Sequence, residues 1–343
     1  MISHNQPLLG DDEQAAASRV INSGWVAQGP ETRLFEAELC QFLGLPEGHV
    51  VAVSSGTAAL FLSLWVLDAK KKRSAIPAYS CSALSNAIQM MGGELTILDS
   101  SEGNPNVGLD KFVTPDFSIA VVPHMFGIPV DLSNIDNVEI IEDCAQAIGA
   151  KVNSLPVGLQ GRLGVYSFSA TKLMTTGGQG GAVVSKDKDL IDQIRDYREF
   201  DGRRDKNPRF NFQITDIQAA IGRVQLEKLP RFLERRRLIF KRYNKHAPLL
   251  QSGNKSCRGV PYRAIFETSN PQSVIQFFGQ RKITCINPMN RWELASDGGP
   301  TPNADQLSQS LVSLPIYPAL NEEAMCQVTK TLSQWQGSPT VCG

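Results

Sequence analysis

The sequence predicts an α/β fold: a mostly parallel, doubly wound sheet followed by a smaller α+β region. Short β-prone runs alternate with segments of helical periodicity over residues 11–243, and this alternation is typical of parallel sheets. Most of these runs end in small or polar residues, so the carboxyl ends of the strands are expected to carry the ligand site. From about residue 247, short strands, Pro- and Gly-rich loops and one final helix indicate the α+β region.

Each expected element follows from apolar spacing and from the turn residues beside it. Apolar residues at helical spacing predict helices over residues 11–23, 31–43, 58–67, 82–91, 189–201 and 322–335. Compact apolar runs predict strands over residues 50–53, 74–77, 95–98, 119–123, 137–143, 164–169 and 182–184. A further helix, capped by Thr215 or Asp216 and reaching Tyr243, is expected to be interrupted at Pro230. It would link a large domain of residues 1–240 to a small domain of residues 241–343.

The charge balance argues against nucleic acid and membrane surfaces as partners. Thirty-four Lys and Arg residues balance 34 Asp and Glu residues, so the formal net charge is zero. The basic runs at residues 70–73 and 235–237 are expected to be solvated faces. The N-terminus lacks a secretory signal pattern, and the most apolar run, residues 58–67, is too short to span a bilayer.

Cysteine and histidine usage argues against a metal site. The seven cysteines include no C-x-x-C pair, and the four histidines do not cluster with them. An odd cysteine count without paired spacing fits a reducing compartment. We therefore expect a cytoplasmic protein that holds no metal.

One lysine, Lys172, lies in a loop of small residues between two strand-like runs. The run that ends at Ser167 precedes it, and the glycine-rich stretch Gly177–Gly181 follows it. In a tight turn, desolvation disfavours the charged amine and lowers its pKa, and a neutral amine is a nucleophile toward an aldehyde. For this stretch taken alone, a solvated loop lysine is the alternative.

A second stretch has the residues that a phosphate group needs. The strand over residues 50–53 breaks at small residues, and a helix begins near Gly56, Thr57 and Ala58. The free N–H groups and the dipole at a helix start favour a phosphate, and the Ser167 hydroxyl could add a donor. An ordinary N-cap and a buried strand hydroxyl are the alternatives.

Two further residues match the needs of a pyridoxal phosphate ring. Asp143 ends an apolar strand and can pair with the pyridine nitrogen, which keeps the ring protonated as an electron sink. Gln146 is a candidate partner for the ring oxygen. Alone, Asp143 could be a helix cap and Gln146 a solvated helix residue, but their coincidence with Lys172 favours the cofactor.

Candidate side chains recur at or just past the predicted strand ends. They are Thr57, Cys81, His124, Asp143, Gln146 and Ser167. Because the carboxyl ends of parallel strands share one edge of the sheet, we expect these residues to meet there.

Motifs along nearly the whole chain resemble the DegT/StrS family of sugar aminotransferases, which are fold type I pyridoxal phosphate enzymes. The matching segments are Ser23–Pro30, Ser54–Leu60, Ile141–Ala150, Ser167–Lys172, Gly177–Val184, Asn211–Gly222 and Ser313–Pro318. Each motif alone is modestly specific, and their order along the chain makes the resemblance specific.

The resemblance implies roles for single residues. Lys172 would form the Schiff base and then move the proton between the amino donor and the cofactor, and Asp143 would pair with the ring nitrogen. Gln146 would lie against the ring. Thr57, Ala58 and Ser167 would hold the phosphate, and Asn211 would reach across a homodimer with shared active sites.

Departures from the family pattern lie at several candidate positions. Cys81 stands where many relatives place an aromatic residue over the ring, and Gln213 replaces a common arginine.

Trp25 is expected to be a packing anchor in its loop or, together with His124 and Tyr317, a substrate contact.

The resemblance implies transfer of an amino group from L-glutamate or L-glutamine to a keto-sugar nucleotide. Such a step belongs to amino-sugar biosynthesis for a surface polysaccharide or a secondary metabolite. Two alternatives stay open: a pyridoxal phosphate-dependent sugar dehydratase on the same fold, and a non-catalytic regulator that binds the cofactor. Lys172 argues against the dehydratase, because relatives with that chemistry carry histidine there.

Overall fold

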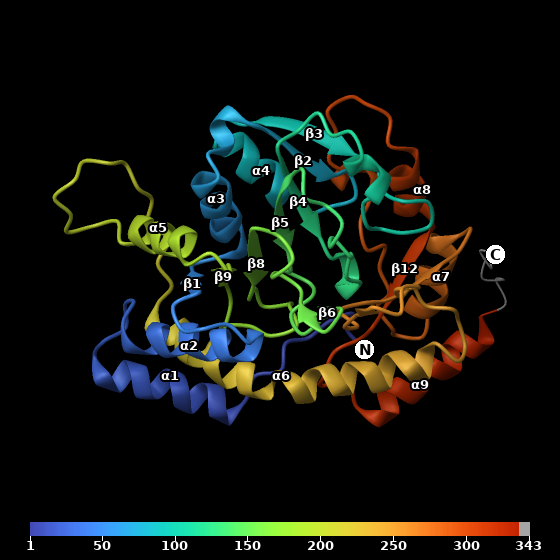
Figure 1. Cartoon of the computed structure of the whole chain (residues 1–343). Helices are drawn as coiled ribbons and strands as arrows, with labels where there is room; N and C mark the ends of the chain where they lie inside the picture. The colour runs from blue at the N-terminus through green and yellow to red at the C-terminus, as the bar shows by residue number, and fades with distance from the viewer. Residues whose placement is uncertain (336–343) are drawn as a thin grey trace.

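A computed structural model, which describes residues 1–335, is built around a seven-stranded sheet (Figure 1). The strand order is β1-β9-β8-β5-β4-β2-β3. The strands are β1 (Val50–Val53), β2 (Arg73–Pro77), β3 (Glu94–Leu98), β4 (Ile119–Pro123), β5 (Glu139–Asp143), β8 (Leu163–Ser167) and β9 (Gly181–Val184). Only β9 runs antiparallel to its neighbours in this sheet. The predicted mostly parallel α/β fold is therefore confirmed.

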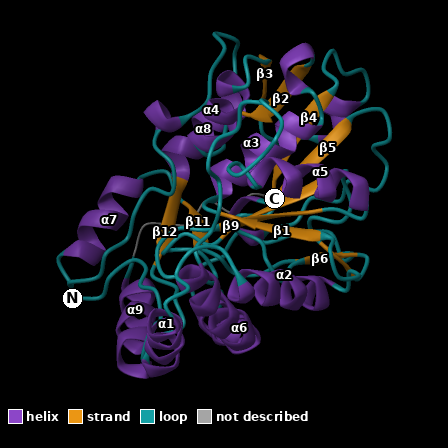
Figure 2. Ribbon diagram, turned by 90° about the vertical axis from the view of Figure 1, so that its left-hand side faces the viewer, coloured by secondary structure: helices purple, strands orange, loops and turns teal. Residues whose placement is uncertain are grey.

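Helices cover both faces of the sheet. The helices of the whole described part are α1 (Asp11–Ser23), α2 (Pro30–Leu43), α3 (Gly56–Val66), α4 (Ser82–Met90), α5 (Lys188–Arg198), α6 (Asp216–Tyr243), α7 (Pro271–Gly279), α8 (Pro302–Ser310) and α9 (Glu322–Gln334). Short 3₁₀ helices are η1 (Ala69–Lys71), η2 (Leu109–Phe112), η3 (Met125–Gly127) and η4 (Arg291–Glu293). Figure 2 shows α1, α2 and α6 together on one side of the sheet.

The alternation of side chains along β1 explains why both faces are covered. Val50 and Ala52 belong to the core cluster on the side of α2 and α6, whereas Val51 and Val53 belong to the cluster on the side of α3. Successive side chains of a strand point to opposite faces, so an apolar run without polar alternation must be buried on both.

Helix α6 differs from its sequence-based expectation at two residues. It runs unbroken from Asp216 to Tyr243 through Pro230, which lies on its exposed side. The neighbouring Leu229 and Phe232 are buried in packing that holds the helix together across the missing N–H. Arg236, expected in a solvated face, is 1% exposed and donates to the carbonyl oxygens of Tyr262 (3.1 Å) and Ile316 (2.9 Å).

The C-terminal part has a core of its own. This cluster joins the end of α6 to α7, α9 and the paired strands β11 (Ala264–Glu267) and β12 (Leu311–Leu314), and the N-terminal Ile2 packs into it. A third small sheet combines β6 (Lys151–Val152), β7 (Leu155–Pro156) and β10 (Cys257–Arg258). The division into residues 1–240 and 241–343 stays a prediction; its boundary falls inside α6, and residues 336–343 lie outside the described part.

Two general properties follow from the described residues. Within residues 1–335, no helix combines the length and apolar character that crossing a bilayer requires. The six cysteines of this part are free thiols.

Candidate active site

The strand ends bring the predicted residues to one edge of the sheet. Asp143 at the end of β5 pairs in register with Val165, two residues before Ser167 ends β8. Ser167 in turn lies opposite Gly181, which lies opposite the last residue of β1. The α3 N-terminus, the Ser167 hydroxyl and the Asp143 carboxyl therefore belong to one edge, as the sequence predicted.

Two glycines let the backbone close tightly around the start of α3. A Cβ atom on Gly56 would lie 2.8 Å from the Cβ atom of Ser167, and one on Gly181 would lie 2.4 Å from the carbonyl oxygen of Ser55. Both distances are shorter than packed carbon and oxygen atoms allow. Only glycine fits at these two positions, and the result is a narrow cradle in front of the helix.

The donors in this cradle differ from the prediction at one residue. Ser55 caps α3, and its Oγ accepts the N–H of Ala58 at 3.1 Å, so the predicted phosphate donor Ala58 already has a partner. Among residues 1–335, no partner receives the N–H groups of Gly56 and Thr57 or the hydroxyl of Ser167. These three donors are free for an anion, which the helix dipole also favours.

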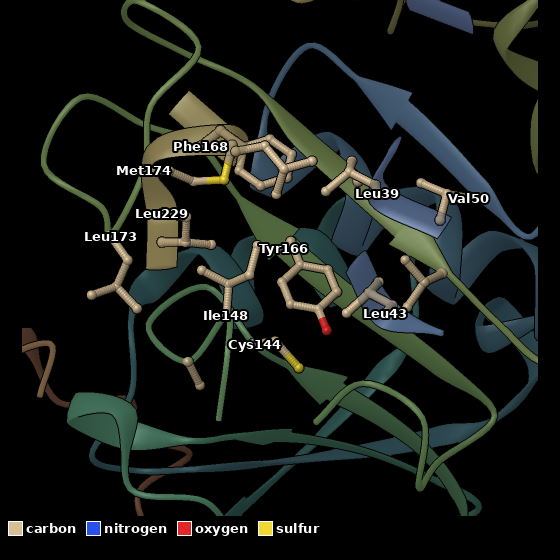
Figure 3. Packing of buried hydrophobic residues seen from close by; sticks show 14 of the residues in the cluster. Leu39, Leu43, Val50, Cys144, Ile148, Tyr166, Phe168, Leu173, Met174 and Leu229 are labelled. Carbon is tan, nitrogen blue, oxygen red and sulfur yellow. The ribbon is translucent and has the colours of Figure 1, made fainter. Parts of the chain in front are cut away.

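The turn that carries Lys172 is anchored on both sides. Phe168, Leu173 and Met174 are buried in the core cluster beside Leu229 of α6 (Figure 3). The Lys172 N–H donates to the Ser169 carbonyl at 3.0 Å, and the Phe168 carbonyl accepts the N–H of Thr176 at 3.1 Å. The lysine backbone is therefore fixed, while its side chain is half-buried rather than fully shielded as expected.

Asp143 is a buried carboxyl that faces a positive charge. Its Oδ1 accepts the N–H of Ala145 at 2.9 Å. Burial raises the pKa of Asp143, and the Ala145 hydrogen bond and the charge of Lys172 oppose this rise without cancelling it. A carboxylate here gains from a further cationic partner, such as a protonated ring nitrogen.

Gln146 is oriented by the backbone of η3. Its Oε1 accepts the N–H of Phe126 at 2.8 Å. Phe126 has a φ of 57°, in the left-handed region that few residues other than glycine adopt. The Gln146 NH2 group is left with no partner among the described residues, so it can donate to a ligand oxygen.

His124 is buried and bound to protein partners, and its substrate role stays a prediction. Its ring is 1% exposed, with Nε2 3.0 Å from Glu142 and Nδ1 3.0 Å from the N–H of Val130. Burial acts to raise the pKa of Glu142, but the His124 hydrogen bond and backbone N–H groups outweigh it and lower the pKa. Cys144 lies within 4.8 Å of both groups, yet these polar atoms are committed to protein partners.

The other predicted substrate residues are not brought to Lys172 by a described contact. Trp25 is 60% exposed and its Nε1 donates to the Gln28 carbonyl at 3.1 Å, so it is no packing anchor in this chain. Tyr317 is 5% exposed and belongs to the C-terminal core cluster. Cys81 is exposed at the N-terminus of α4, past the end of β2, and Asn211 is exposed in the segment before α6.

The structure adds two residues that sequence reasoning missed. The ring of Tyr262 lies beneath Lys172, whose Nζ is 5.5 Å from the ring centroid. Arg263 follows it and stacks on the same ring, with its guanidinium carbon 5.3 Å from the centroid. No motif marks these residues, and 90 positions separate Tyr262 from the lysine.

Known proteins match both the sequence and the fold of this chain. The DegT/DnrJ/EryC1/StrS aminotransferase family matches residues 7–333. A dTDP-4-dehydro-2,3,6-trideoxy-D-glucose 4-aminotransferase of Saccharopolyspora spinosa is 29% identical over 94% of this chain and 93% of its own. The solved aminotransferase TlmJ of Streptoalloteichus hindustanus is 27% identical with a TM-score of 0.91, covering 97% of this chain and 98% of its own. DesV of S. venezuelae, solved with a ketimine intermediate, is 26% identical with a TM-score of 0.84, covering 94% of both chains.

Proposed function

This chain belongs to the DegT/DnrJ/EryC1/StrS aminotransferase family, and from that premise we propose that it transfers an amino group from L-glutamate or L-glutamine to a keto-sugar nucleotide. The relative from Saccharopolyspora spinosa, which acts on a dTDP-linked 4-keto sugar, supports this class of acceptor. Amino-sugar biosynthesis for a surface polysaccharide or a secondary metabolite is the setting. The observation that carries the proposal is that Lys172 acts electrostatically on the buried Asp143, and that Asp143 ends and Lys172 follows a strand at the sheet edge with the cradle at α3.

The donor set fits pyridoxal phosphate. The free N–H groups of Gly56 and Thr57 and the Ser167 hydroxyl suit its phosphate, and the glycine cradle leaves the backbone close enough to reach it. The Asp143 carboxyl, whose pKa burial raises, suits a positively charged ring nitrogen. The free NH2 group of Gln146 suits a ring oxygen.

When bound, pyridoxal phosphate supplies an aldehyde that accepts an amino group and a ring that accepts electrons. The Lys172 amine would take the proton from the α-carbon of the amino donor and return a proton in the second half of the reaction. The Asp143 carboxylate would hold the proton on the ring nitrogen in place. Gly56 and Thr57 would bind the phosphate and fix the position of the reacting atoms.

A homodimer with shared active sites is part of the proposal. The segment between α5 and α6 projects away from the body of the chain (Figure 1). Arg203 and Arg209 each form ion pairs with both Asp196 and Asp205, at 2.5 to 3.0 Å. These ion pairs lie within one chain, so the segment keeps its conformation without a second subunit. Near the end of this segment, Phe210 is 59% exposed, and a second chain would cover this large apolar side chain.

The test is glutamate turnover by purified protein loaded with pyridoxal phosphate. Addition of L-glutamate should change the visible absorption and release one 2-oxoglutarate per active site, even without a sugar, because the two half-reactions share one site. Lys172→Ala should abolish both signals, while Lys186→Ala, an exposed lysine nearby in sequence, should keep them. Cofactor binding without any glutamate turnover would favour the regulator, and loss of a sugar hydroxyl without amine transfer would favour the dehydratase.

A further inference from the structure

A cavity of about 410 Å³ lies between the C-terminal half of α6 and residues 250–263. Four basic residues line it: Arg237, Lys241, Arg258 and Arg263. No acidic residue is among the residues that line it. Phe126, Phe240 and Val260 supply an apolar wall beside these charges.

This cavity departs from the charge balance of other cavities in the described residues. The cavity between α2 and α5 sets three arginines against three glutamates. The cavity beside α1, α2 and α6 sets two arginines against two glutamates. Because the whole chain has a formal net charge of zero, four cations around one hollow that no acidic residue lines are a local feature and not a consequence of composition.

The neighbouring acids reach only one of these cations. Glu234, one turn before Arg237, forms a long ion pair with it at 3.8 Å, and burial followed by the charge of Arg258 still lowers the pKa of Arg237. Asp131 hydrogen-bonds to the hydroxyl groups of Ser133 and Ser256. Within residues 1–335, Lys241 and Arg258 have no ion pair.

Among residues 1–335, the contacts of Arg263 are with neutral groups. Its guanidinium lies 3.2 Å from Nε2 of His4 and stacks on the ring of Tyr262. Burial and the charges of Arg263 and Arg236 lower the pKa of His4 to about 3, so at neutral pH this ring adds no charge to the cavity. The hollow therefore keeps a net positive field, from Lys241, Arg258 and Arg263 above all.

An anion relieves the repulsion between cations that are held together in this way. Arginine forks bind phosphate oxygens with paired, charge-assisted hydrogen bonds, and the apolar wall can take the face of a ring. A volume of about 410 Å³ lies in the range of small-molecule sites. We propose that this cavity binds a small molecule that carries a phosphate or diphosphate group and a flat ring, of the nucleoside diphosphate kind.

The cavity is separate from the phosphate cradle at α3, because none of the cradle residues lines it, but its lining segment leads to the ring under Lys172. Val260 lines the cavity, and its N–H donates to the Gly127 carbonyl at 3.0 Å. A Cβ atom on Gly127 would lie 1.9 Å from the Val260 carbonyl oxygen, so the two backbones are in direct contact. Two residues after Val260, Tyr262 lies under Lys172. The ligand is therefore either a free nucleotide or the nucleotide part of a larger substrate.

The test is calorimetric titration of the cofactor-loaded protein with thymidine 5′-diphosphate and, separately, with inorganic pyrophosphate. Saturable binding of at least one probe, at one site per chain, is expected. Lys241→Ser and Arg258→Ser should each weaken it about 10-fold, because each removes a charge-assisted contact. Lys245→Ser and Arg231→Ser are matched controls, since both side chains are exposed near the cavity without lining it, and they should leave the affinity unchanged.

Each result bears on the cavity alone. Lack of saturable binding of both probes to the unmodified protein, or equal affinities for the Lys241→Ser and Lys245→Ser proteins, would overturn the proposal. Titration with thymidine 5′-diphosphate-glucose distinguishes the two possible ligands. If it binds as tightly as thymidine 5′-diphosphate, the ligand is a sugar nucleotide, and if it binds much more weakly, the ligand is a free nucleotide. A protein that fails to turn over glutamate would refute the proposed function and leave the calorimetric result standing.

Discussion

The side-chain nitrogen of Lys172 lies over the ring of Tyr262, 5.5 Å from the ring centroid. Tyr262 is 6% exposed, and its carbonyl oxygen accepts a hydrogen bond from the buried Arg236. A fixed aromatic face attracts a cation electrostatically. Tyr262 therefore acts as a positioning residue for the lysine, although it comes from the C-terminal part of the chain.

Replacement of this ring should slow the first half-reaction. A cation–π contact contributes about 0.5–2 kcal/mol, so Tyr262→Leu should lower the rate of the glutamate-induced absorbance change about 2- to 30-fold. Tyr262→Phe keeps the aromatic face and should stay within about 2-fold of the original rate. Stopped-flow absorbance measures both rates, and a thermal melt of each variant separates a positioning effect from unfolding. Equal rates for the Leu and Phe variants would contradict the role.

The same contact should be visible in the titration of the phenol. Burial acts to raise the pKa of Tyr262, but the positive charges of Lys172, Arg263 and Arg236 outweigh it and hold the pKa below its usual value. Lys172→Met removes one of these charges and should raise the pKa of Tyr262. Carbon-13 NMR of labelled tyrosine Cζ atoms reports this, with the Tyr262→Phe protein identifying the signal. An unchanged titration would show that the lysine and the ring do not interact.

The Asp143→Asn change should stabilise the cofactor-free protein. Burial raises the folded-state pKa of Asp143 above its value in the unfolded chain, so this group makes the protein less stable as pH rises through that interval. Asn keeps an acceptor for the Ala145 N–H without the charge. The two proteins should melt alike near pH 4, and Asp143→Asn should melt a few degrees higher at pH 7, on the order of 1 kcal/mol.

Pyridoxal phosphate should reverse this order. The cofactor ring gives the Asp143 carboxylate a cationic partner, so the unmodified protein should gain more thermal stability from it than the Asp143→Asn protein. Differential scanning calorimetry with and without the cofactor measures the four melting temperatures. Equal stabilisation of both proteins by pyridoxal phosphate would show that the Asp143 carboxylate does not interact with the cofactor ring.

Sequence periodicity predicted the elements and the strand edge because both depend on neighbouring residues. Asp143 and Ser167 lie at the ends of their strands, and this position does not depend on which other strands those strands pair with. The direction of His124 could not be predicted, because Glu142 on the adjacent strand sets it. The burial of Arg236 depends on carbonyl groups 26 and 80 positions away, which no local pattern contains. Pro230 was predicted to break α6 from local propensity, and packing on both sides overrides that propensity.

His4 should make the protein sensitive to acid. Burial, followed by the charges of Arg263 and Arg236, lowers its pKa from the usual 6.5 to about 3. The folded state keeps the ring neutral while the unfolded chain protonates, so stability is full above pH 6.5 and is lost as pH falls toward 3. At pH 5 this loss is about 2 kcal/mol.

Urea unfolding at pH 8 and pH 5 tests this dependence. His4→Gln can still hydrogen-bond to Ser313, whose Oγ lies 2.9 Å from the imidazole Nε2. It lacks the titrating group, so it should lose about 2 kcal/mol less than the unmodified protein between these pH values. The same loss in both proteins would mean that His4 leaves its buried position before the chain unfolds.

Asp216 should be the most costly capping residue to remove. It opens α6 but accepts hydrogen bonds from the start of α2: the N–H groups of Gly29 (2.7 Å), Glu31 (3.1 Å) and Thr32 (3.0 Å), and the Thr32 hydroxyl (2.7 Å). The carboxyl is 1% exposed, so water cannot replace it. Asp216→Ala leaves these donors buried without partners and should cost about 2–4 kcal/mol of unfolding free energy.

The neighbouring Thr215 is the matched control. Its exposed hydroxyl accepts the N–H of Gln218 at 3.3 Å and caps α6 itself. Thr215→Ala should cost about 1 kcal/mol, because water can reach the N–H that it frees. Urea unfolding at pH 7 should therefore rank Asp216→Ala well below Thr215→Ala in stability, with Asp216→Asn between them because one carbonyl oxygen remains. Equal losses would mean that the two helices are joined by apolar packing alone, since the capping carboxyl would then contribute no more than an exposed hydroxyl.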